Sequence, residues 1–186
     1  MKKASSLYAV SLSKPLAFTA VFAALCCIGT VVIAIPLPVG YFNVGDVFVL
    51  LAGWCLGPIY GPIAAGTGSA IADIVSGFPL YVPATFFIKA LDALIAYTVW
   101  FFLKKCFQKE KFDFIPRIFA TILGESVMIT GYLLYDSILY GFSAAFGGLF
   151  GNVMQGVFCG LIAILTVAIL YHTKAARKWF PSLECK

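Results

Sequence analysis

A lysine and a glutamate stand inside long apolar stretches of this chain, where a charged group is costly. Lys89 lies in the stretch 83–103 and Glu125 in the stretch 116–140, each near the middle if these stretches cross a membrane. An ionisable group at the centre of a membrane helix costs roughly 2.5–3.5 kcal/mol, so each needs a partner or a water-filled cavity. Lys89 could pair with Glu125, or with Asp92 on nearly the same helix face. Such a cluster is either a structural ion pair between helices or a ligand-binding group with its counter-charge, and buried ions in spans favour the second reading.

Further polar side chains follow the helical repeat towards the outer face. Tyr132 and Asp136 follow Glu125 at intervals of seven and four residues, which places all three in one stripe of a helix. Asn152 and Gln155 share one face near the start of the last apolar stretch. Together with the buried lysine, these groups are expected to converge on the outer half of the protein. Asn152 and Gln155 are either ligand contacts or interhelical hydrogen-bonding groups, and the sequence leaves both open.

Aromatic residues crowd the predicted outer loops, where most would form the interfacial belt of a membrane protein. Tyr41 and Phe42, in the first such loop, are candidates to stack on a planar ligand. Asn43 also suits the N-cap of the helix that follows, with Asp46 in its first turn. Asp73 could bind a ligand, but capping or pairing with the outer loops is at least as plausible. The candidate binding residues are therefore Tyr41, Phe42, Asn43, Lys89, Glu125, Tyr132, Asp136, Asn152 and Gln155.

The sequence carries no recognisable catalytic or metal-binding motif. It contains no Gly-x-Ser-x-Gly, no Walker A motif and no pair of histidines, so the chain is not expected to be an enzyme or to hydrolyse ATP by itself. Its one histidine, His172, lies at the end of an apolar stretch, and its six cysteines show no Cys-x-x-Cys spacing. We therefore predict no metal site and no cofactor.

The elements that must position these residues are membrane helices. Hydrophobic residues make up 62% of the 186 positions and charged residues 11%, with a mean hydropathy of +0.99, too few charges to cover a soluble domain. The sequence predicts an all-α integral membrane bundle, residues 1–186 forming one six-helix domain. Helix-stopping prolines and glycines separate the spans, which are expected at 16–35, 44–56, 60–75, 83–103, 116–140 and 146–171.

The distribution of basic residues predicts the orientation of these spans. Every lysine and arginine except Lys89 falls in segments on one side of the predicted membrane. Because positively charged loops are retained in the cytoplasm, both termini are expected to be cytoplasmic in a multi-pass plasma-membrane protein. The net charge of +5 then indicates contact with anionic membrane lipid and gives no indication of nucleic-acid binding.

Four segments together carry a family resemblance that covers nearly the whole chain: 41–58, 66–73, 79–90 and 151–156. They contain Tyr-Phe-Asn-Val-Gly-Asp (41–46), Gly-Thr-Gly-Ser-Ala-Ile-Ala-Asp (66–73) and Gly-Asn-Val-Met-Gln-Gly (151–156). This pattern resembles the substrate-binding S component of energy-coupling factor (ECF) vitamin transporters, in the riboflavin-transporter-like branch.

The resemblance implies six helices and a vitamin pocket that opens to the outside, built from the first outer loop and the last three helices. It also implies docking on a transmembrane coupling subunit that transmits work from two cytoplasmic ATPase subunits. Docking in this family uses an Ala-x-x-x-Ala motif on the first helix, which Ala20 and Ala24 match. The resemblance does not fix the vitamin: riboflavin, pyridoxine, hydroxymethylpyrimidine and pantothenate types all remain, with a heteroaromatic compound favoured. An anionic ligand would suit Lys89, and a neutral ring would suit Asn152 and Gln155.

Two other functions compete with this one. A self-contained secondary transporter would use Glu125 or Asp136 as a proton relay and would need no ATPase partner. A membrane enzyme acting on lipid or isoprenoid substrates ranks last, because the sequence lacks the expected acidic metal-binding clusters.

Overall fold

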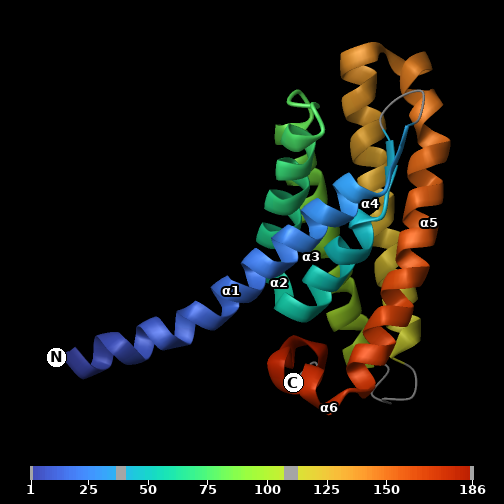
Figure 1. The fold of residues 1–186 in the computed structure, drawn as a ribbon. Coiled ribbons are helices and arrows are strands. Elements are labelled where there is room, and N and C mark those ends of the chain that lie inside the picture. Colours follow the sequence, from blue (N-terminus) through green and yellow to red (C-terminus); the bar gives the residue numbers. More distant parts are fainter. Residues whose placement is uncertain (1, 37–40, 107–112, 185–186) are drawn as a thin grey trace.

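The computed structural model describes residues 2–36, 41–106 and 113–184, and within them the chain is helical apart from one short hairpin. Five helices are long and apolar enough to cross a membrane: α1 (Lys2–Val32), α2 (Gly45–Val75), α3 (Val82–Cys106), α4 (Phe114–Tyr140) and α5 (Phe142–His172). A short helix α6 (Lys174–Trp179) and a 3₁₀ turn (Pro181–Glu184) follow. The helices lie side by side, with α1 crossing the bundle obliquely (Figure 1).

Helix α2 contains both of the short spans that the sequence predicts at 44–56 and 60–75. Its helical geometry breaks at Gly57, where φ is 81° and ψ is −168°, a conformation that glycine adopts without steric cost. The next residue, Pro58, cannot donate the backbone hydrogen bond that would carry the helix through. A Cβ atom on Gly61 would lie 2.7 Å from the carbonyl oxygen of Ala52, so the two halves of α2 pack directly on each other.

The folded-back α2 forms the centre of the bundle. It packs against α1, α3 and α5, while α3 packs on α4 and α4 on α5. In its most apolar stretch 67% of residues are buried, against 28–33% in the other four long helices. Small residues permit this close packing: a Cβ on Gly68 would lie 2.2 Å from the carbonyl oxygen of Ala23 on α1, and one on Gly53 would lie 2.5 Å from that of Ala93 on α3.

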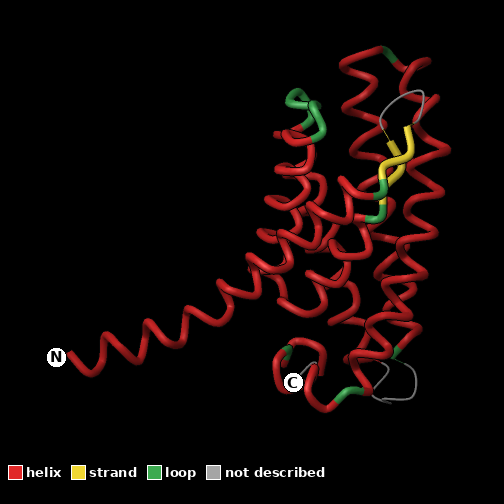
Figure 2. The backbone as a smooth tube through the Cα atoms, viewed as in Figure 1, coloured by secondary structure: helices red, strands yellow, loops and turns green. Residues whose placement is uncertain are grey.

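A two-stranded antiparallel hairpin connects α1 to α2. Strand β1 (Ala34–Pro36) pairs with β2 (Tyr41–Asn43), and Ile35 lies opposite Phe42. The first helix therefore ends at Val32, three residues before the predicted end at residue 35, because the following residues take the extended conformation of β1. Figure 2 shows the hairpin (yellow) lying along the upper part of the bundle.

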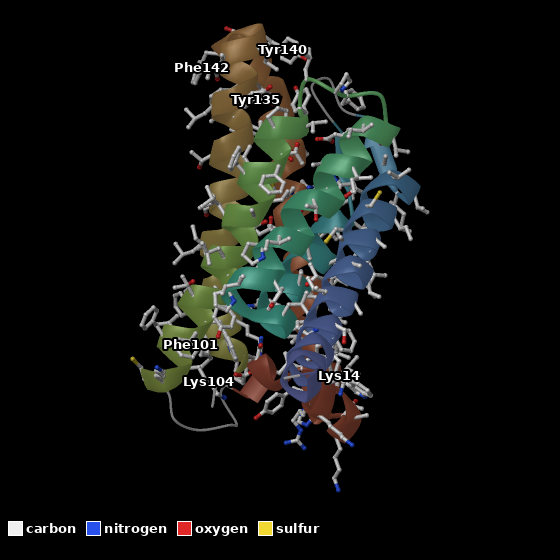
Figure 3. All side chains as sticks on the ribbon, turned by 90° about the vertical axis from the view of Figure 1, so that its left-hand side faces the viewer. Lys14, Phe101, Lys104, Tyr135, Tyr140 and Phe142 are labelled. Atoms are coloured by element: carbon white, nitrogen blue, oxygen red, sulfur yellow. The ribbon has the colours of Figure 1, made fainter. Side chains whose placement is uncertain are left out.

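The two ends of the bundle differ in composition. Lys14 and Lys104 lie at one end, which we call the basic end, and Tyr135, Tyr140 and Phe142 lie at the opposite end, which we call the aromatic end (Figure 3). Both chain termini point towards the basic end (Figure 1). This separation agrees with the predicted placement of the basic loops on one side.

A buried ionic cluster joins three elements at the basic end. Asp113 Oδ2 accepts a hydrogen bond of 2.7 Å from Arg117 Nε, and its Oδ1 accepts from Trp100 Nε1 at 3.1 Å and forms an ion pair with Lys104 Nζ at 3.0 Å. Burial alone would raise the pKa of the Asp113 carboxyl, but the charge of Arg117 and these hydrogen bonds hold that pKa below its usual value. The Arg117 guanidinium lies between two indole rings, 4.4 Å from that of Trp100 and 5.1 Å from that of Trp54.

Candidate functional site

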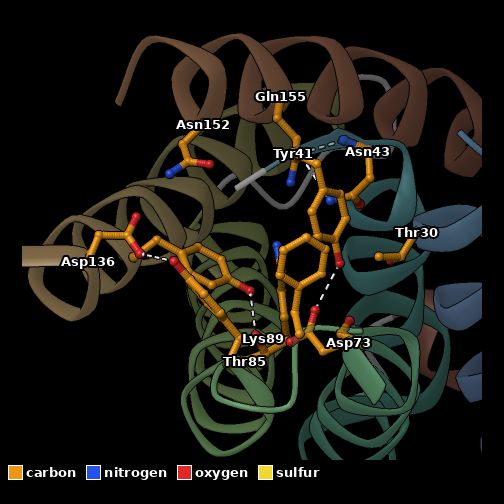
Figure 4. Close-up of a pocket in the computed structure, with 13 residues that line it drawn as sticks. Thr30, Tyr41, Asn43, Asp73, Thr85, Lys89, Asp136, Asn152 and Gln155 are labelled. Carbon is orange, nitrogen blue, oxygen red and sulfur yellow. Dashed lines mark hydrogen bonds between the residues drawn. The ribbon is translucent and has the colours of Figure 1, made fainter. Parts of the chain in front are cut away.

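A polar pocket opens near the aromatic end, between the hairpin and the five long helices. It has about 550 Å³ of empty space including its open mouth. Figure 4 shows the side chains that point into it from separate elements. The lining residues are Thr30 from α1, Tyr41 and Asn43 from β2, Ser69 and Asp73 from α2, Phe78 and Tyr81 from the following loop, Thr85 and Lys89 from α3, Tyr132 and Asp136 from α4, and Asn152 and Gln155 from α5.

An ion pair forms the floor of this pocket. Lys89 Nζ donates to Asp46 Oδ1, and both residues are buried, 3% and 0% exposed respectively. The aromatic ring of Tyr132 covers the ammonium group, with its centroid 5.4 Å from Nζ. Asp46 lies in the first turn of α2, as predicted. The predicted pairing of Lys89 with Glu125 or Asp92 is wrong: its partner is Asp46, which the fold-back of α2 brings beside α3.

Gln155 connects this ion pair to the hairpin. Its Nε2 donates to Asp46 Oδ2 at 2.6 Å, and its Oε1 accepts from Asn43 N at 2.7 Å and from Asn43 Nδ2 at 3.1 Å. Asn43 in turn accepts from Gly45 N at 2.9 Å through Oδ1. The N-cap position of α2 falls on Val44, so the predicted N-cap role of Asn43 is wrong, although its side chain still bonds the start of that helix. One amide thus joins β2, α2 and α5 around the buried charge.

Each carboxylate that lines the pocket accepts a hydrogen bond from a tyrosine hydroxyl through one of its oxygens. Tyr41 OH donates to Asp73 Oδ1 at 2.8 Å, and Tyr81 OH donates to Asp136 Oδ1 at 2.6 Å. These bonds fix the hairpin and the α2–α3 loop over the mouth of the pocket. The rings of Tyr41 and Phe78 also contact each other, with centroids 5.3 Å apart and planes tilted by 31°.

Other polar atoms at the pocket have no partner among the described residues. Within the described part of the chain, Ser69 Oγ and Asp73 Oδ2 are buried without a hydrogen bond. Both residues line the pocket, and they lie four apart on α2, on one helix face. The side-chain amide of Asn152 also lines the pocket, and no described residue bonds to it. These atoms are available to a bound molecule.

Seven of the nine predicted binding residues line the pocket: Tyr41, Asn43, Lys89, Tyr132, Asp136, Asn152 and Gln155. Phe42 lies outside it, because alternation along β2 turns its side chain away from its neighbours; its ring meets that of Phe158 at 6.5 Å. Glu125 also lies outside it and borders a separate apolar groove between α4 and α5. Both carboxylate oxygens of Glu125 are buried without a partner among the described residues, and the same holds for Asp92.

Several lining residues were not predicted from the sequence, namely Thr30, Ser69, Phe78, Tyr81 and Thr85. A periodic signal existed for two of them, since Ser69 lies four residues before Asp73 and Thr85 four before Lys89. No local signal marked Asp46 as the partner of Lys89. The counter-charge of a buried lysine is set by tertiary packing.

On α1, Ala20 and Ala24 are exposed, as a docking motif requires. Their small side chains leave α1 open to close approach by another helix.

The pocket combines aromatic faces with hydrogen-bonding groups, which suits noncovalent recognition of a small polar ring compound. Among the described residues, no group of three or more histidine, cysteine, aspartate or glutamate side chains lies close enough to hold a metal ion.

Comparisons with known proteins show what this chain is similar to. The sequence profile of the family "ECF-type riboflavin transporter, S component" matches residues 11–172. A Pyrococcus woesei protein described as "Uncharacterized protein in gap 3'region" is 32% identical over 130 residues, which cover 69% of this chain and 82% of that protein. A solved structure titled "Structure and mechanism of the S component of a bacterial ECF transporter" superimposes with a TM-score of 0.62 at 23% identity, covering 85% of this chain and 95% of that one. At that identity the solved structure supports the fold alone.

Proposed function

Because the chain belongs to the family of ECF-type riboflavin transporter S components, we propose that it captures a water-soluble heteroaromatic B-type vitamin, or a precursor of one, from outside the cell. The family makes it a multi-pass membrane protein and a substrate-binding transporter subunit. The observation that carries the finer proposal is the polar, aromatic-lined pocket at the end of the bundle opposite the basic residues.

The proposed topology has six membrane crossings. The two halves of α2 count as separate spans, since the break at Gly57 lets them pack on each other. The basic end faces the cytoplasm, because lysine- and arginine-rich segments are retained there, and both termini lie on that side. The pocket then opens to the exterior, where a scavenged nutrient would enter.

The proposed partners are a transmembrane coupling subunit and two cytoplasmic ATPase subunits. The exposed small-residue face at Ala20 and Ala24 supports docking of the coupling subunit on α1. The chain itself holds no Walker A motif, so energy for release of the vitamin inside must come from such partners.

Two measurements test this function. The vitamin that remains bound through purification of the full chain should be identifiable by mass spectrometry. Uptake of that vitamin into proteoliposomes should require the coupling and ATPase subunits together with ATP. Uptake by the chain alone, driven by a proton gradient, would instead identify a secondary transporter and contradict the proposal.

A further inference from the structure

We infer that the ligand presents an amino group and an adjacent ring nitrogen to Asp73 and Ser69, as in an amino-substituted nitrogen heterocycle, and that it is neutral or cationic. This inference rests on the proposed function and names the substrate class of the same pocket. It departs from the expectation that Lys89 attracts an anion.

The Lys89 ammonium group is already engaged by protein groups and has little capacity left to bind a ligand. It is paired with Asp46 and covered by the ring of Tyr132. Replacing Asp46 by a ligand carboxylate would leave the aspartate buried and without its cation, at a cost of several kcal/mol. The lysine therefore acts as the fixed counter-charge of Asp46 beneath the pocket.

The charge balance of the pocket disfavours an anionic ligand. Among its described lining residues the ionisable carboxyl and amine groups are Asp73, Asp136 and Lys89, and Asp46 stands directly behind. Lys89 is the one cation among these groups, so the pocket as a whole attracts positive charge and hydrogen-bond donors. In a partly enclosed, low-dielectric site this preference is stronger than it would be in water.

The unpartnered oxygen atoms indicate where a donor would bind. Ser69 is 2% exposed and Asp73 is 4% exposed, and Ser69 Oγ and Asp73 Oδ2 have no hydrogen-bond partner in the described part of the chain. A buried polar atom without a partner costs about 1–3 kcal/mol. An amino group can donate to Asp73 Oδ2 while Tyr41 keeps Oδ1, and the Ser69 hydroxyl can donate to a neighbouring ring nitrogen.

The aromatic residues nearby suit the plane of such a ring. Phe78 and Tyr81 lie edge to face, with centroids 6.3 Å apart, and the tilted pair of Tyr41 and Phe78 stands beside Asp73. A planar heterocycle inserted among these rings would point the edge that carries its amino group towards α2. Its other edge would meet the free amide of Asn152.

A matched pair of small molecules tests the inference on the purified full-length protein. Hydroxymethylpyrimidine, an aminopyrimidine, should bind at least tenfold more tightly than its analogue with a methyl group in place of the amino group. Nicotinate and pantothenate serve as anionic probes and should bind more weakly than the aminopyrimidine. Isothermal titration calorimetry measures all four.

Three variants assign the effect to the two oxygens. Asp73→Asn should weaken aminopyrimidine binding at least tenfold and change binding of the methyl analogue little, because the asparagine offers a donor where an acceptor is needed. Ser69→Ala should weaken it several-fold. Ser126→Ala is the matched control, since that exposed hydroxyl on α4 bonds its own helix, and it should bind as the unaltered protein does.

Equal affinity for the amino and methyl compounds, no binding of the aminopyrimidine, or tighter binding of an anionic probe would each overturn the inference. None of these results decides the proposed function, because vitamin uptake with partner subunits tests that separately. Thermal unfolding of each variant without ligand confirms that Asp73→Asn remains folded.

Discussion

Lys89 on α3 forms a buried ion pair with Asp46 on α2, although the two residues lie 43 positions apart in the sequence. The pair exists because the first half of α2 is held between α3 and α5. Buried pairs add little net stability compared with apolar residues of the same size, but breaking one leaves an uncompensated charge. The pair therefore constrains how α2, α3 and α5 pack beneath the pocket.

Replacement of Asp46 by asparagine should destabilise the protein by about 3–5 kcal/mol, because the Lys89 ammonium then lacks a counter-charge at membrane depth. The double variant Asp46→Leu with Lys89→Met should recover most of this loss. Thermal unfolding in detergent measures both. Lys105→Met is the control on the same helix, since Lys105 is exposed, and it should change stability little. A double variant no more stable than Asp46→Asn would show that charge imbalance is not the cause.

Asn152→Ala and Gln155→Ala should have different consequences, although the two residues lie on one face of α5. Asn152 bonds to no described residue, so its removal should weaken ligand binding at least tenfold and leave thermal stability unchanged. Gln155 bonds Asn43 and Asp46, so its removal should lower both affinity and stability.

Ligand titration and unfolding of the same preparations distinguish these outcomes. Thr166→Ala, a change at an exposed hydroxyl that bonds its own helix, is the control on α5. Equal loss of stability in the Asn152 and Gln155 variants would mean that Asn152 packs structurally rather than contacting the ligand.

Asp113→Asn should lower the free energy of unfolding by about 1–3 kcal/mol at neutral pH, because the carboxylate bonds Arg117, Lys104 and Trp100. The folded-state pKa of this carboxyl lies below its unfolded value of about 3.9, so its contribution is fully present above that value. The contribution is lost as the pH falls through the folded-state pKa.

Unfolding midpoints measured from neutral pH to about pH 3 check this sign. The difference between the unaltered protein and Asp113→Asn should shrink as the pH falls. A difference that grows towards low pH would indicate that Asp113 is protonated in the folded state.

Ala20→Leu combined with Ala24→Leu should block vitamin uptake with the partner subunits by tenfold or more while leaving ligand affinity unchanged. Both alanines are exposed on α1, and larger side chains there would keep a docking helix at a distance. Leu165→Phe is a control that adds bulk to the exposed surface of α5. Normal uptake by the alanine variant would move the docking surface elsewhere.

The sequence predicted the elements of this fold well, because apolar stretches and their proline and glycine boundaries are local features. The break at Gly57–Pro58 was visible in the sequence, and so was the placement of Lys14 and Lys104 at one end. The hairpin was not predicted, since three-residue strands next to a proline carry almost no periodic signal.

Local sequence features could not predict which charged residues pair within the site. Helical spacing correctly grouped Tyr132 with Asp136 and Asn152 with Gln155. It also placed Glu125 in the same stripe, but Glu125 lies about 10 Å from Tyr132 along the helix axis, and in the structure this side chain borders the α4–α5 groove. Asp46 lies in the first turn of α2 as predicted, but that position gave no sign that its carboxylate also pairs with Lys89.

The indole rings of this protein lie far from its pocket. Trp54 and Trp100 flank Arg117, Trp179 stands by Lys14, and none of the three lines the pocket. Intrinsic tryptophan emission should therefore respond if the proposed partner subunits bind at the basic end, and it should change little when the ligand binds. Tyrosine absorbance, from Tyr41, Tyr81 and Tyr132, should change when the ligand binds and change little when partner subunits bind. The two signals of the unlabelled protein can therefore follow ligand binding and assembly separately.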